Sequence, residues 1–419
     1  MVEPAAELPP IGPGPRAPLE PFAAAYAGRS EFASASRPPL VRRYVPFVHT
    51  LRGYGGSRLR TDGVAGLTVA ALALPSSMAY AELAGLPITA GLYALVLPAV
   101  AYAVLGSARW LVVGPEGTVA LLVASGLAPL AAAGSPEYVA LATALAVGVG
   151  LVFVAARLLR LGWIADYFSQ AVLVGYITGV AVLMILGQFG KLVGLSSDVT
   201  NAIVEVADML SRIGDANSAT LAVAAVSLLL LLGLGRLVPR FPWALVVVVG
   251  GIAVSWALDL AAAGVQVTGP VPAGLPSFAV PHVDAAQAAS LVGVALSIFL
   301  VSFADSILTA RSFAAKRHET VDANQELLAF GAANALAGLT QAMPIGTSGS
   351  RTSVNNNLRA TSQVSGLVAV ATIAVILLFL TNPIQYLPAP VLGAVIVAAS
   401  LRAGGSRPGR PRCTPGPAC

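Results

Sequence analysis

Charged side chains are scarce in this sequence of 419 residues. Asp, Glu, Lys and Arg together make up 10% of it, whereas hydrophobic residues make up 57%. Soluble domains usually carry about 25% charged residues. So little charge excludes a soluble globular fold. Helices satisfy their own backbone in lipid, so the composition predicts an all-α polytopic membrane protein.

Cysteine and histidine are equally rare. Cys413 and Cys419 lie in the last seven residues, and His49, His282 and His318 fall in predicted tails or loops. This spacing is too sparse for a metal site, and the sequence has no metalloprotease motif or nucleophile elbow. We therefore predict that the protein is not an enzyme and holds no cofactor or metal. We also expect no nucleic-acid partner.

The two ends of the chain differ from its apolar middle. Residues 1–50 are rich in Pro, Ala and Arg and lack a signal-peptide pattern, which indicates a disordered cytosolic tail. Residues 403–419 form a basic tail rich in Pro and Gly. The apolar domain between them, residues 51–402, should lie in the bilayer of the cell inner (plasma) membrane.

Windows of the length that a bilayer requires, about 20 residues, predict about twelve spans. They are 63–81, 88–106, 116–133, 138–159, 170–190, 219–237, 242–262, 288–310, 324–340, 349–359, 363–381 and 390–402.

The basic residues of the connections support this count, because cytosolic loops collect Lys and Arg. With the N-terminus in the cytosol, every second connection should be basic. The opposite connections fit as well, since 263–287 has no Lys or Arg and 191–218 has more acids than bases. The basic residues on the predicted cytosolic side are Arg109, Arg157, Arg160, Arg236, Arg240, Arg311, Lys316, Arg317 and Arg359.

Two stretches interrupt the apolar pattern at membrane depth. "WLVVGPEGTVALLVASG" (110–126) and "QAMPIGTSGSRTSVNNN" (341–357) each run from a short β-prone segment through a glycine turn into a helical segment. Pro115 suits the first turn of the former, and Ser350 with Arg351 begins the latter. Irregular backbone at this depth must line a cavity or be buried in protein. We expect a short strand before each of two half-helices.

The interruptions fall in the third and tenth windows. An offset of seven spans makes the second copy enter the membrane from the opposite face, which is typical of transporters built from inverted repeats. The N-terminus of a helix carries partial positive charge and free N–H groups. Two such ends that meet at the midplane predict an anion site.

Three charged side chains lie at membrane depth, where an ionised group costs about 2.5–3.5 kcal/mol and is usually paired or functional. Arg351 could bind the anion. Asp305, with Ser302 and Thr309 on its face of the helix, could carry a proton or sodium, or could pair structurally with Arg351 or Arg311. Glu116 suits a first helical turn, yet it would repel an anion unless protonated or matched by Arg351. The small residues of "GAANALAG" (331–338) favour close helix packing.

Five blocks in register resemble the SulP (sulfate permease) anion transporters, whose relatives include prestin and pendrin. The blocks are "DGVAGLTVAALALPSSMAYAELAGLPITAGLY" (62–93), "VVGPEGT" (112–118), "GYITGVAVLMILGQFGKLVG" (175–194), "DSILTARSFA" (305–314) and "NQELLAFGAANALAGLTQAMPIGTSGSRT" (324–352).

This resemblance implies two inverted seven-helix repeats divided into core and gate domains, with an anion between the third and tenth helix N-termini. It implies binding positions at Ser76, Tyr80, Glu116, Gly117, Thr118, Ser350 and Arg351, and an eighth-helix acid at Asp305. We assign coupling to a proton or sodium to Asp305, Thr309 and Glu116, and we expect a homodimer.

The sequence departs from the family after residue 402. Relatives continue through two more helices and usually a cytosolic STAS domain, so we expect an incomplete second repeat and a non-native tail. Sulfate is the favoured substrate, and bicarbonate or a dicarboxylate remains open. A nucleobase transporter of this fold would prefer an acid where Ser350 and Arg351 stand. A non-transporting fragment or assembly subunit is the alternative of another class.

Overall fold

The computed structural model describes residues 45–48, 54–167, 170–195, 202–237, 243–317 and 319–404. The predicted tail 1–50 lies outside these residues except for 45–48, and the tail 403–419 lies outside them except for its first two residues. The first half contains α4 (Gly56–Leu83), α5 (Ile88–Tyr93), α6 (Leu97–Leu105), β1 (Val113–Gly114), α7 (Gly117–Leu127), α8 (Pro136–Leu158), η2 (Leu161–Asp166), α9 (Gln170–Leu186), α10 (Phe189–Val193) and α11 (Ala202–Ser211).

The second half is also almost entirely helical. Each of the twelve predicted windows contains a helix or part of one. Among the described residues, five helices are long and apolar enough to cross a membrane. The remaining elements are η3 (Ile213–Asp215), α12 (Ser218–Leu229), η4 (Leu230–Leu234), α13 (Gly235–Leu237), α14 (Trp243–Leu258), α15 (Ala285–Arg317), α16 (Ala323–Leu339), β2 (Gly346–Thr347), α17 (Gly349–Asn357), α18 (Val364–Phe379), η5 (Asn382–Tyr386) and α19 (Ala389–Gly404).

Both predicted strands are present, and they pair with each other. β1 and β2 are antiparallel, with Val113 opposite Thr347 and Gly114 opposite Gly346. Gly114 has a φ of +151°, and a Cβ there would meet the side chains of Leu95 and Arg351. The pairing joins two interruptions that are far apart in the sequence and fixes where both half-helices, α7 and α17, begin.

The starts of the half-helices differ from prediction by one or two residues. Pro115 lies outside α7, because Glu116 is the N-cap and its carboxylate accepts the N–H groups of Thr118 and Val119. α17 begins at Gly349, not at Ser350, because the Ser348 hydroxyl supplies the N-cap. A polar side chain at the N-cap satisfies first-turn donors, so it sets the boundary.

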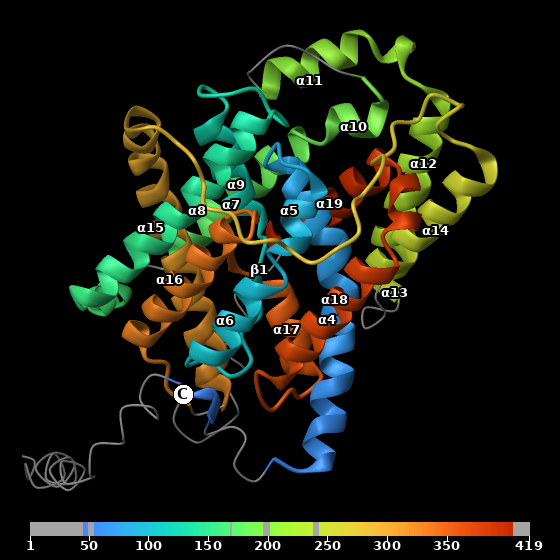
Figure 1. The fold of residues 1–419 in the computed structure, drawn as a ribbon. Helices are drawn as coiled ribbons and strands as arrows, with labels where there is room; N and C mark the ends of the chain where they lie inside the picture. The colour runs from blue at the N-terminus through green and yellow to red at the C-terminus, as the bar shows by residue number, and fades with distance from the viewer. Residues whose placement is uncertain are drawn as a thin grey trace, which may run out of the picture. The chain divides into compact units, whose positions relative to one another are not determined.

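Helix contacts follow an internal two-fold pattern; Figure 1 labels the helices concerned. If α4, α6, α7 and α8 correspond to α15, α16, α17 and α18, then the α4–α18 contact mirrors the α8–α15 contact. In the same way α8–α16 mirrors α6–α18, and α7–α15 mirrors α4–α17. The α6–α16 and β1–β2 contacts map onto themselves. This is the arrangement that an inverted repeat predicts.

Two apolar clusters hold these helices together. The first packs α5 to α8 against α15 and α16, and the second packs α4 and α18 against α9, α14 and α19. α10 lies against α11, α12 and α19.

The predicted close packing at residues 331–338 is confirmed. A Cβ at Gly331 would meet Val154, and one at Gly338 would overlap the carbonyl oxygen of Thr143. From the other side, a Cβ at Gly150 would meet the backbone of Ala335. Small residues thus let α8 and α16 approach until their backbones touch.

Two buried carboxylates, near the starts of α4 and α16, accept hydrogen bonds from residues far away in the sequence. Asp62 accepts hydrogen bonds from Tyr54, Thr361 and Ser362. Burial raises the pKa of the Tyr54 phenol to about 12, so it remains a donor. Glu326 accepts from Ser107, Ala108 and Tyr102. Every oxygen of these carboxylates has a partner, as a buried charge requires.

Candidate functional site

The N-terminus of α17 presents donors to the outside. Gly349 and Ser350 are exposed, whereas Thr347, Ser348 and Arg351 are buried. The Ser348 hydroxyl accepts the Arg351 N–H at 3.4 Å and lies 3.4 Å from the Ser350 hydroxyl. Helix geometry gives first-turn N–H groups no intrahelical acceptor. The N–H groups of Gly349 and Ser350 are therefore oriented for an external acceptor.

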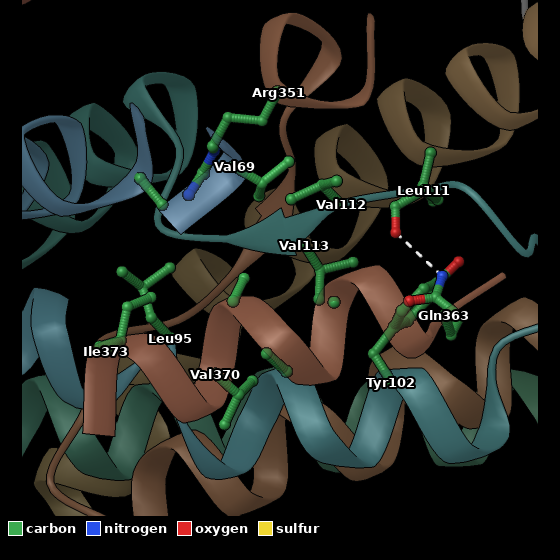
Figure 2. A pocket seen from close by; sticks show the side chains of 14 residues that line it. Val69, Leu95, Tyr102, Leu111, Val112, Val113, Arg351, Gln363, Val370 and Ile373 are labelled. Carbon is green, nitrogen blue, oxygen red and sulfur yellow. Dashed lines mark hydrogen bonds between the residues drawn. The ribbon is translucent and has the colours of Figure 1, made fainter. Parts of the chain in front are cut away.

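The Arg351 side chain crosses to the other interruption. It is 3% exposed, and its Nη2 donates to the carbonyl oxygen of Pro115. Its Nη1 has no hydrogen-bond partner among the described residues and packs next to Gly114. Figure 2 shows the side chain reaching from its helix toward β1. One guanidinium thus places positive charge between the two half-helix starts.

The N-terminus of α7 carries its own acceptor. The Glu116 carboxylate accepts the Thr118 N–H at 2.8 Å and the Val119 N–H at 3.3 Å. Gly117 packs against Tyr80 and Met184 so closely that a Cβ would collide with Met184. In this structure, the donors of the two half-helices are therefore unequal: those of α7 are largely occupied, and those of α17 face outward.

Tyr80 joins the predicted site from α4. Its ring lies beside Gly117, and its hydroxyl is within electrostatic range of Glu116 and Arg351. Ser76 is one turn earlier on the same helix. Its hydroxyl donates to the carbonyl oxygens of Leu72 and Ala73, so the contacts of Ser76 are within its own helix.

Asp305 on α15 lies within electrostatic range of Glu116. Its Oδ1 is 3.5 Å from the Thr309 hydroxyl, as the helical spacing predicted. The alternative of a structural pair with Arg351 or Arg311 is not seen: Arg311 pairs with Asp166 at 2.8 Å, and none of the ion pairs among the described residues involves Asp305.

Hydroxyl groups near Asp305 extend the site beyond the predicted residues. The Thr347 hydroxyl donates to the Ser306 hydroxyl at 2.6 Å, which links β2 to α15. Ser302 Oγ is buried without a partner among the described residues and lies close to Gly346. Ser306 follows Ser302 by one helical turn, a signal that the spacing around Asp305 could have shown.

The structure thus brings together Tyr80, Gly117 and Glu116 with Asp305 and Arg351. Thr118 and Thr309 join this group through hydrogen bonds to its carboxylates. Ser350 stands at its exposed edge, next to Ser348.

A cavity of about 650 Å³ lies elsewhere, at the end of α4. It is lined by Glu82, by Leu86 to Thr89, by Gln266 to Thr268, by Pro270 to Pro272, and by Ala389 at the start of α19. Glu82 at its edge pairs with Lys191 of α10 at 2.9 Å. No local pattern in the sequence indicates this partner for Glu82.

Known proteins resemble this chain over most of its length. The sequence profile of the Sulfate permease family matches residues 59–403. A Mycobacterium tuberculosis protein named "Probable sulfate transporter" is 39% identical over 86% of this chain, and the chain spans 64% of that protein. Human solute carrier family 26 member 6 is 31% identical over 80% of the chain, which spans 47% of the human protein.

Solved structures share the fold. The structure of SLC26A9 superposes with a TM-score of 0.82 over 95% of this chain and 65% of that one, at 22% identity. The transmembrane domain of the cyanobacterial bicarbonate transporter BicA superposes with a TM-score of 0.74, covering 83% of this chain and 90% of that domain, also at 22% identity. At such identities the likeness concerns the fold, and it confirms the polytopic all-α architecture.

Proposed function

Because this chain belongs to the sulfate permease family, we propose that it moves an inorganic anion, sulfate first, across the cytoplasmic membrane as a secondary transporter. The chain spans less than two thirds of the length of the curated relatives cited above, so the proposal depends on its own site. The observation that carries it is the start of α17, where exposed Gly349 and Ser350 precede the buried Arg351, whose guanidinium reaches the start of the other half-helix.

The chemistry of this end suits an oxyanion. The N–H groups of Gly349 and Ser350 and the hydroxyls of Ser348 and Ser350 are short-range donors, and Arg351 adds charge without being exposed. Hydrogen bonds to a charged acceptor are about twice as strong as neutral ones. A nucleobase transporter remains disfavoured, since the start of α17 has an arginine where such a protein would prefer an acid. Bicarbonate and dicarboxylates would use the same donors.

Asp305, Glu116 and Thr309 would couple the anion to a proton or sodium. Inward movement of a divalent anion opposes a negative-inside potential by about 2.3 kcal/mol per charge per 100 mV. Two neighbouring carboxylates with hydroxyls around them are the oxygen-rich environment that either cation prefers. Anion exchange would make this coupling unnecessary.

Family membership also supports finer inferences about the assembly. We infer transport without enzymatic activity, an N-terminus on the cytoplasmic side and a homodimer in the plasma membrane. The basic residues of alternate connections support the orientation.

Counterflow of labelled sulfate into liposomes that contain the purified chain tests the proposal. We expect uptake above that of empty liposomes, with competition by unlabelled sulfate stronger than by bicarbonate, succinate or chloride. Stronger competition by bicarbonate or succinate would reassign the substrate. Uptake equal to that of empty liposomes would refute transport by this chain.

A matched pair of variants tests the start of α17. Gly349→Pro removes one N–H donor, while a proline fits a first turn and Ser348 already has the extended backbone that must precede proline. Gly349→Ala keeps the N–H, and its Cβ would meet nothing within 4 Å. We expect the proline variant to raise the half-saturating sulfate concentration about tenfold and the alanine variant to leave it unchanged. Equal values in both variants would remove this N–H from the site.

A further inference from the structure

The segment 108–112, between α6 and β1, is neither helix nor strand, yet Ala108, Trp110, Leu111 and Val112 are all buried. Buried backbone donors and acceptors must find partners, and a bilayer offers no water to supply them. The segment leads directly into β1 and α7. Whatever satisfies its backbone also fixes where α7 begins.

Three polar side chains from the other half of the molecule supply partners. The Val112 N–H donates to the Thr352 hydroxyl at 3.0 Å. Asn355 Nδ2 donates to the Trp110 carbonyl oxygen at 2.9 Å. Gln363 Nε2 donates to the carbonyl oxygens of Ala108 and Leu111 at 2.8 and 3.0 Å, the latter shown in Figure 2.

These contacts continue the β1–β2 pairing at its α17 end. The Ser348 N–H donates to the Val112 carbonyl oxygen at 3.0 Å, and from there Thr352 and Asn355 follow along one face of α17 at helical spacing. Thr352, Asn355 and Gln363 are 0%, 2% and 7% exposed. Because these three side chains are buried, they do not contact an anion at the exposed Gly349 and Ser350. They form hydrogen bonds with the backbone of residues 108–112 instead.

We propose that Thr352, Asn355 and Gln363 are positioning residues that hold the N-termini of α7 and α17 at a fixed separation. Their effect on anion affinity rests on the function proposed above. A site that binds an ion between two helix ends requires geometry fixed to about 0.5 Å. Side chains that bind the backbone directly, and not another flexible side chain, provide such a constraint.

Thr352→Val is the sharpest variant, because valine keeps the shape and removes the acceptor of the Val112 N–H. Thr352→Ser keeps the acceptor. Thr372→Val is the matched control: the Thr372 hydroxyl donates to Val368 within α18, so the same chemical change leaves 108–112 untouched.

Two measurements follow in the full chain. The first is sulfate counterflow, with half-saturating concentration and maximum rate determined separately. The second is the distance distribution between spin labels at the exposed positions Ser125 and Asn357, after replacement of Cys413 and Cys419 by serine. The labels report on α7 and α17 whether or not the protein transports.

We expect Thr352→Val to broaden the distance distribution and to raise the half-saturating concentration about three- to tenfold, the equivalent of one net hydrogen bond. The maximum rate per folded molecule should change less than twofold. Thr352→Ser and Thr372→Val should match the wild type in both measurements.

Two results would overturn the proposal. One is an unchanged distance distribution in Thr352→Val. The other is an unchanged half-saturating concentration in Thr352→Val, whatever its maximum rate per folded molecule. If the wild type shows no counterflow but Thr352→Val still broadens the distribution, the positioning role stands and the anion-transport function fails.

Discussion

At the scale of single residues, Arg351 combines two tasks that the sequence could not separate. A lone arginine in an apolar region indicated a functional charge. The structure adds its acceptor, the carbonyl oxygen of Pro115, which lies 236 residues earlier in the chain. Arg351 therefore joins the two half-helices, and in the proposed function it also supplies positive charge to the anion.

Arg351→Gln should raise the half-saturating sulfate concentration at least severalfold. The change removes a buried charge, and a hydrogen bond involving a charged group contributes about 1.5–3 kcal/mol. Counterflow in liposomes is the measurement. Arg359→Gln, on the exposed turn after α17, is the control that should behave as the wild type. Unchanged affinity in Arg351→Gln would remove this residue from the anion site.

Asp305→Asn should abolish uptake driven by a proton or sodium gradient while anion counterflow persists. Asparagine imitates the protonated acid, so it can no longer carry the charge that accompanies the anion. Both activities are measured in the same liposomes. Loss of both together would indicate a structural aspartate, and retained gradient-driven uptake would exclude Asp305 from coupling.

The sequence predicted the charged members of the site better than the polar ones. Charges at membrane depth are conspicuous, so Glu116, Asp305 and Arg351 could be selected without a structure. The three asparagines at 355–357 could not be interpreted, because their partners depend on the fold. Asn355 donates to Trp110, Asn356 accepts from Arg317, and Asn357 is exposed.

At the scale of elements, glycines decide how closely helices pack. The spacing of small residues predicted the α8–α16 contact, but it could not say which glycine touches backbone. Gly338 does, since a Cβ there would overlap the Thr143 carbonyl oxygen. A Cβ added at Gly293 on α15 would meet no atom within 4 Å.

Gly338→Ala should therefore lower stability by about 1–3 kcal/mol, the usual cost of overpacking. Gly293→Ala should leave stability unchanged or raise it by up to about 1 kcal/mol, because alanine favours helix over glycine. Thermal unfolding of both variants in the same detergent compares them. Equal destabilisation of both variants would show that contact with α8 is not responsible for the effect at Gly338.

At the scale of the whole molecule, the inverted repeat was predictable and its connections between halves were not. An offset of seven windows and the alternation of basic loops indicated the two-fold relation. By contrast, Asp62 and Glu326 bind loops more than 200 residues away, and no local pattern predicts such partners. The Glu82–Lys191 pair lies within the first half, where it joins α4 to α10, and no local pattern predicts it either.

This pair connects helices whose neighbours differ in part: α4 packs against α17 and α18, and α10 against α11 and α12, while both contact α19. Transport requires such helices to move relative to each other, so the pair should stabilise the arrangement seen here. Its side chains are 29% and 24% exposed. Solvent screening then limits its contribution to about 0.2–1 kcal/mol, a population shift of at most about fivefold.

We expect Lys191→Gln to raise the rate at which a membrane-impermeant thiol reagent modifies Thr89→Cys by up to about fivefold, because Thr89 lines the 650 Å³ cavity beside Glu82. The measurement uses a background without Cys413 and Cys419. Combining Glu82→Lys with Lys191→Glu should restore the original rate, since the reversed pair can form the same contact. Arg212→Gln, which removes the local pair with Asp208, should leave the rate unchanged. If the rate is the same with and without the Glu82–Lys191 pair, the pair does not hold the cavity in its present form.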